Sequence, residues 1–143
     1  MTSAPPYAGS RGAALRAPLM VAGATLAATT YVGAVDPNEG GHYPACPFLA
    51  LTGLYCPVCG SLRAVHALAH GDVTAAVGLN VLAVAGLAAL VALWVVWVAR
   101  AAGGARHVGQ APTLPRWVGP VLLVAAVVFG VLRNLPAGSA LAP

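Results

Sequence analysis

No charged residue occurs between Asp72 and Arg100. This run of Leu, Val and Ala is longer than the roughly 20 apolar residues that an α-helix needs to cross the hydrocarbon of a bilayer. Of the 143 residues, 59% are hydrophobic and 7% are charged, whereas a soluble domain has about a quarter charged residues. The chain cannot cover itself with a water-soluble surface, so we expect an all-α membrane protein.

The uncharged stretches predict about three transmembrane helices within one membrane domain, residues 17–136, flanked by a flexible amino-terminal tail (1–16) and a carboxyl-terminal tail (137–143). The third span is short, and the arginines at its two ends would extend it by snorkelling. The first stretch also fits a secretory signal peptide that is cleaved after Ala34. The expected spans are residues 17–35, 74–99 and 117–133.

The basic residues are seven arginines, scattered singly, and the chain has no lysine. Five of them lie in the amino-terminal tail and in the connection between the second and third spans, against two elsewhere. The positive-inside rule then places the amino terminus in the cytoplasm and the cysteine loop outside, in a multi-pass protein of the cell membrane. A binding site for nucleic acid would need a basic cluster, so nucleic acid is excluded. An arginine-only basic set with abundant Ala, Val and Gly is typical of a GC-rich bacterial genome.

All three cysteines fall in one short loop, residues 36–60, that follows the first span. Cys46 and Cys56 are each followed by Pro, and Cys59 is followed by Gly, which favours a folded turn over a slack linker. Residues 61–70 have the periodicity of a short amphipathic helix. Ser61 is the expected N-cap of this helix and Gly71 its stop. Asp72 is expected to cap the second span, and Asn80 to lie at the lipid boundary.

Two interpretations of the cysteines are structural. An oxidising compartment favours a disulfide of Cys46 with Cys56 or Cys59, which would staple the loop and leave one thiol over. Alternatively, the Cys-x-x-Cys pair is half of a tetrahedral zinc site. The candidate ligands of that site are Cys46, Cys56, Cys59, His42 and His66.

The third interpretation is redox catalysis. Cys56-x-x-Cys59 precedes a helix start, and Arg63 lies one turn beyond, so the helix dipole and the guanidinium would lower the pKa of Cys59. Membrane enzymes that pass electrons from thiols to quinone have a similar spacing. They generally use a second cysteine pair and four spans, which this chain lacks.

The order of these motifs resembles a family of small bacterial membrane proteins, domain of unknown function 2752. The resemblance extends from Asp36 to Pro136 and is most specific in the cysteine segment. Three positions depart from the pattern, with Val58 for Gly, Leu62 for Thr and Val81 for Pro. The resemblance implies a membrane location and no known activity. The motifs that carry it are Asp36-Pro37, Tyr43-Pro44-Ala45-Cys46-Pro47-Phe48, Leu51-Thr52-Gly53-Leu54-Tyr55-Cys56-Pro57-Val58-Cys59-Gly60, Arg63, Gly71-Asp72, Asn80 and Arg133-Asn134-Leu135-Pro136.

The sequence contains no acid pair, no nucleophile with a base and no phosphate loop, so we expect a non-enzymatic accessory or interaction subunit. Its expected partners are the lipid bilayer and a second membrane protein. Zinc and a quinone are the candidate cofactors, but the sequence favours a protein without a cofactor. The alternatives are a quinone-coupled thiol-disulfide oxidoreductase and a metal-binding cysteine knuckle.

Overall fold

The computed structural model describes residues 11–103 and 112–142. This part of the chain is helical and contains no strand, which confirms the predicted all-α class. The predicted tail before residue 11 and Arg106, which was expected to be cytoplasmic, lie outside the described residues. The helices are α1 (Arg11–Ala34), α2 (Pro47–Thr52), α3 (Ser61–Ala69), α4 (Val73–Ala102), α5 (Val118–Leu132) and the 3-10 helix η1 (Pro136–Leu141).

Two of the helices, over Gly12–Ala34 and Val73–Ala102, are long and apolar enough to cross a membrane. The third expected span corresponds to α5, which is apolar but has only 15 residues. α1 begins at Arg11, before the predicted start at residue 17, because the Ala and Leu residues in this turn are good helix formers. Residues 11–16 are therefore helical and not a flexible tail.

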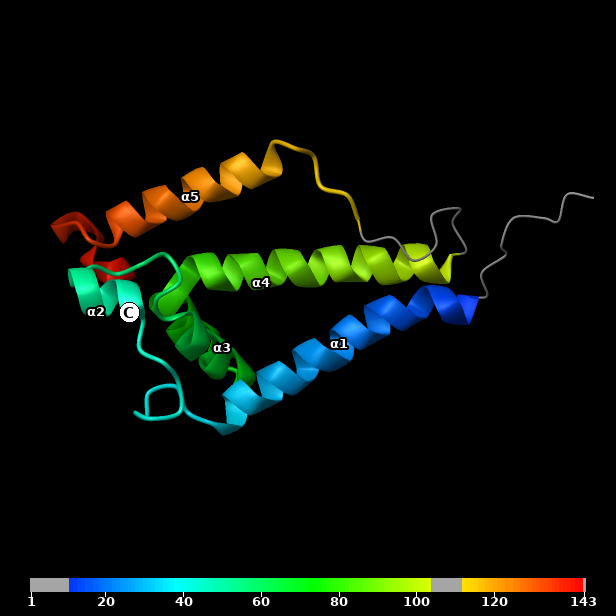
Figure 1. Cartoon of the computed structure of the whole chain (residues 1–143), viewed down its shortest axis with the longest axis horizontal. Coiled ribbons are helices and arrows are strands. Elements are labelled where there is room, and N and C mark those ends of the chain that lie inside the picture. Colours follow the sequence, from blue (N-terminus) through cyan, green and yellow to red (C-terminus); the bar gives the residue numbers. More distant parts are fainter. Residues whose placement is uncertain (1–10, 104–111, 143) are drawn as a thin grey trace, which may run out of the picture.

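α4 runs antiparallel to α1 and to α5 (Figure 1). α1 and α4 meet where Ala14 and Ala101 are buried, and they diverge toward the other end. There α3 packs against both, with the His66 ring 2.8 Å from the carbonyl of Val32. The described part of the chain thus forms an open frame of long helices closed at one end by α3.

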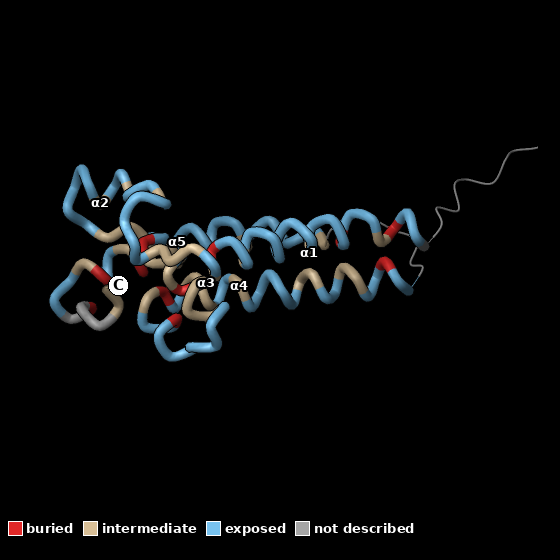
Figure 2. Tube along the Cα trace, turned by 90° about the horizontal axis from the view of Figure 1, so that it is seen from below, coloured by how far each residue is buried: buried red, intermediate tan, exposed pale blue. Residues whose placement is uncertain are grey.

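Buried residues gather at that closed end, while most of the surface of the long helices is exposed (Figure 2). We call this end the head and define it as residues 46–80 and 129–136. α5 joins it through Gly130, where an added Cβ would lie 3.3 Å from the ring of Pro57. The head therefore brings together the cysteine segment, α3, the start of α4 and the end of α5.

α4 is broken at Asn80, whose φ of −164° and ψ of 93° are not helical. The Asn80 side-chain oxygen accepts a hydrogen bond from the Ala83 amide at 2.9 Å, so it caps the helix that starts again after the break. Only 1% of Asn80 is exposed. The expectation that this side chain lies at the lipid boundary was wrong, because its amide is used inside the head.

The short helices of the head depend on turns that favour glycine. α3 was predicted over residues 61–70, and its N-cap is Gly60, with φ +84°, in place of the expected Ser61. Gly71, with φ +80°, ends the turn after α3, and Asp72 caps α4 by accepting from the Ala75 amide at 2.8 Å, as predicted. α2 and η1 were not predicted, since six residues carry too little periodicity to identify a helix.

Candidate functional site

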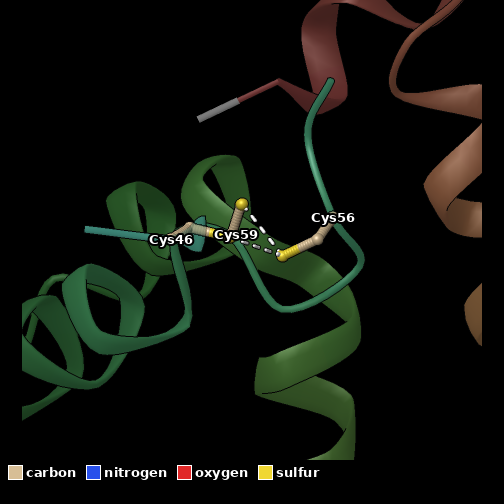
Figure 3. A group of neighbouring side chains, drawn as sticks. All are labelled: Cys46, Cys56 and Cys59. Atoms are coloured by element: carbon tan, nitrogen blue, oxygen red, sulfur yellow. Dashed lines mark hydrogen bonds between the residues drawn. The ribbon is translucent and has the colours of Figure 1, made fainter. Parts of the chain in front are cut away.

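The three cysteine sulfurs converge on one point in the head (Figure 3). All three Sγ atoms lie within 4.8 Å of one another. Cys46 Sγ is 3.5 Å from Cys56 Sγ, and Cys56 Sγ is 2.9 Å from Cys59 Sγ. The three thiols are free.

Local backbone geometry explains why the sulfurs meet. Cys46 is the N-cap of α2, and Pro47 starts that helix, where its missing amide costs nothing. Gly53 ends α2 with φ +70°, which lets the chain turn back toward Cys46. The Cys59 amide donates to the Cys56 carbonyl at 3.1 Å, closing a tight turn that holds the two sulfurs on the same side.

The Cys46–Cys56 separation fits two thiolates on one metal ion better than a disulfide, and the Cys56–Cys59 separation lies between the two. A disulfide would bring two sulfurs to about 2.05 Å and would leave the third without a reason to converge. In a tetrahedral zinc site with bonds of about 2.3 Å, neighbouring sulfurs are about 3.8 Å apart. The Cys46–Cys56 distance is close to that value, and the Cys56–Cys59 pair would have to open by almost 1 Å.

Asn80 holds the turn from the side of α4. Its Nδ2 group lies 2.9 Å from the Pro57 carbonyl, 3.0 Å from the Cys59 carbonyl and 3.2 Å from Ser61 Oγ. These acceptors surround one buried amide, so the break in α4 and the shape of the cysteine turn depend on the same side chain.

Arg133 holds the turn from the side of α5. One guanidinium nitrogen donates to the carbonyls of Cys56 and Cys59 at 2.9 and 3.0 Å, and the other lies 3.5 Å from the Leu79 carbonyl at the break in α4. The guanidinium carbon lies 4.9 Å from the ring centre of Phe129. Arg133 is only 2% exposed, and its Nε has no hydrogen-bond partner in the described part of the chain.

Asn134 fixes the residue that precedes Cys56. Its side-chain oxygen accepts from the Tyr55 amide, and its Nδ2 donates to the Tyr55 carbonyl, both at 2.8 Å. The Asn134 side chain therefore makes the two hydrogen bonds with the Tyr55 backbone that a neighbouring β-strand would make. Together with Asn80 and Arg133, it satisfies the backbone of the cysteine turn with side chains distant in the sequence.

The thiols differ in acidity. The amide of Leu49, at the start of α2, holds the pKa of Cys46 below its usual value. Burial, followed by the neighbouring thiols, raises the pKa of Cys59 to about 12. This is opposite to the direction expected from the helix dipole and Arg63, because Cys59 is only 8% exposed and desolvation disfavours its thiolate.

The remaining sequence-predicted residues do not join the cluster. His66 Nδ1 faces the Val32 carbonyl, and its Nε2 lies 3.9 Å from Asp36. His42 is exposed and lies outside the group of converging ligands. The Arg63 side chain forms no hydrogen bond or ion pair in the described residues. The structure therefore groups Cys46, Cys56 and Cys59 and leaves both histidines and Arg63 apart.

The described residues define a class of protein that is helical, with two apolar helices long enough to cross a membrane and a cluster of three cysteines at one end. Residues 46–94 match the family described as protein of unknown function (DUF2752). The predicted resemblance is confirmed over these residues, and Arg133 and Asn134 lie outside them. No curated protein and no solved structure matches the chain.

Proposed function

We propose that this is an integral membrane protein that binds one divalent metal ion, zinc in the first place, through the thiolates of Cys46, Cys56 and Cys59. The observation that carries the proposal is the convergence of all three sulfurs within 4.8 Å. Three sulfur donors at this spacing suit zinc, which favours thiolates in tetrahedral sites. A disulfide accounts for only two of the three.

The charge of Arg133 supports the same conclusion. Its buried guanidinium bonds to neutral carbonyls, and none of the carboxylates Asp36, Glu39 and Asp72 pairs with it. A buried cation without an anion is costly. Three thiolates around a divalent ion carry one net negative charge, which would balance Arg133.

Insertion in the bilayer accounts for the exposed apolar helices. α1, α4 and α5 expose large hydrophobic side chains along their length, for example Leu90 at 64% and Leu123 at 66%. Lipid would cover these faces, with α5 as the third span and its short length extended by flanking arginines. The arginine distribution favours a cytoplasmic amino terminus and an extracytoplasmic head. In this arrangement the protein is a non-enzymatic accessory subunit whose head is held by metal.

One observation speaks against the quinone-coupled oxidoreductase. The apolar cavity of ≈ 580 Å³ lies between α1 and α4, and its lining on α4 begins at Leu87. This is about 10 Å along the helix from Asn80 and the cysteine turn.

The test is the metal content and mass of protein purified in detergent without reducing agent. We expect one zinc ion per chain, the mass of three free thiols after denaturation, and alkylation of the native thiols only after a chelator is added. Cys46→Ser should lower metal affinity, and Asn38→Ala, purified in the same way, is the control, because exposed Asn38 bonds only to Asp36. A mass lower by two hydrogen atoms, together with no bound metal, would contradict the proposal in favour of a disulfide staple.

A further inference from the structure

The segment that carries the cysteines has an exposed apolar surface. No Asp, Glu, Lys or Arg occurs between Glu39 and Arg63. α2 has six residues and buries none of them, and Leu51 on this helix is 86% exposed (Figure 2). The other large apolar side chains exposed in this segment are Phe48, Leu54 and Val58. Helices as short as α2 are marginal in water without packing, so we expect an apolar environment around it.

The polar groups of α2 have hydrogen-bond partners within the segment. The Gly53 amide donates to the Leu49 carbonyl at 2.9 Å, which closes the end of the helix. Thr52 is the only residue of α2 with a polar side chain. Its hydroxyl donates to the Phe48 carbonyl at 2.6 Å and accepts from the Leu54 amide at 3.2 Å. The exposed face of α2 therefore presents apolar side chains and no free hydroxyl.

The cysteine turn obtains its hydrogen bonds from other helices. The side chains of Asn80, Arg133 and Asn134 bond to backbone groups of residues 55–59. A loop in water can bond to solvent instead, whereas in lipid no water replaces a missing partner. The network that shapes the turn is thus also the kind of network that an environment poor in water requires.

The turn lies at the level where an apolar helix ends. Gly130 is in the last turn of α5, and a Cβ added there would lie 3.3 Å from the Pro57 ring. Figure 1 shows α2 at the same end of the molecule as the carboxyl end of α5. Irregular backbone does not face the hydrocarbon of a bilayer, so the expected depth is the boundary between headgroups and acyl chains.

We infer that α2 and the cysteine turn insert into this boundary, and that Leu51 and the apolar side chains around it contact lipid. This inference rests on the part of the proposed function that places the chain in a bilayer, and it does not depend on the metal. Interfacial helices bury their apolar face by about 5–10 Å in this region. A protein partner would meet a polar rim with direct hydrogen bonds, which the exposed side chains of α2 do not offer. The three cysteines then lie at the membrane boundary, beside lipid.

The test is photo-crosslinking of the full chain in vesicles of phosphatidylethanolamine and phosphatidylglycerol, with lipid in large excess. The benzophenone amino acid p-benzoylphenylalanine replaces Leu51, where a large ring displaces no buried group. After irradiation, we expect the peptide that contains position 51 to gain the mass of one lipid molecule. The same replacement of Leu90 on α4 is the positive control, and that of exposed Asn38 is the negative control.

Three results would overturn the inference and leave membrane insertion of the long helices intact. A lipid adduct at position 90 and none at position 51 would mean that α2 lies in water. A cross-link between two chains at position 51, in place of lipid, would mean that a second copy covers α2. Equal lipid adducts at positions 38 and 51 would remove the argument from the apolar surface. The absence of a lipid adduct at position 90 would instead contradict the membrane part of the proposed function.

Discussion

Replacing Arg133 with Met is expected to lower zinc affinity by about 10- to 100-fold and to destabilise the head by about 3 kcal/mol. The substitution leaves the Cys56 and Cys59 carbonyls without their donor at the point where the turn sets the sulfur positions. It also removes the positive charge that balances the metal-thiolate centre. Competition with a zinc chelator measures the affinity, and thermal unfolding in detergent measures the stability.

Two variants test whether the effect of Arg133→Met comes from the charge and position of Arg133 and not from the loss of any arginine. Arg133→Lys keeps the charge and loses the forked hydrogen bonds, so it should recover part of the zinc affinity. Arg63→Gln removes the arginine that lies nearest to the cysteines in the sequence. This variant should leave the zinc affinity almost unchanged, because the Arg63 side chain forms no hydrogen bond or ion pair in the described residues. If Arg63→Gln weakens zinc binding as much as Arg133→Met, Arg133 is not the specific cation that balances the metal-thiolate centre.

Replacing Asn80 with Leu is expected to destabilise the head by about 2–4 kcal/mol. The variant loses the amide that bonds to the Pro57 and Cys59 carbonyls, and it loses the oxygen that caps α4 at Ala83. Leu favours a continuous helix, so the break in α4 should also be reduced. Thermal unfolding and chelator competition are the measurements.

Asn38→Ala is the matched control for Asn80, because Asn38 is exposed and bonds only locally to Asp36. It should change unfolding by less than about 0.5 kcal/mol. Equal effects from the two asparagines would show that the head does not depend on the Asn80 network.

Local patterns in the sequence predicted the long helices and the cysteine turn. The uncharged run after Asp72 identified α4, and the periodicity after Gly60 identified α3 with nearly its observed bounds. The prolines and glycines around the cysteines predicted a folded segment. These signals are local, because helix length and turn geometry depend on neighbouring residues.

The supports of the site could not be predicted because they come from distant parts of the chain. Arg133 is 74 residues from Cys59, and Asn134 is 79 residues from Tyr55. The only arginine near the cysteines in sequence is Arg63, so a local argument chose it, whereas in the fold Arg133 donates to the Cys56 and Cys59 carbonyls. The same limit applies to the acidity of Cys59, since burial among distant residues outweighs the dipole of its own helix.

X-ray absorption at the zinc edge, on the full chain purified in detergent, would show directly whether the three cysteines bind the metal. We expect a first coordination shell with three sulfur atoms at about 2.3 Å and one lighter donor at about 2.0–2.1 Å. In the Cys46→Ser variant the sulfur count should fall by one. Zinc without sulfur neighbours, or no zinc together with a Cys46 disulfide, would contradict the claim that the three cysteines form a metal site.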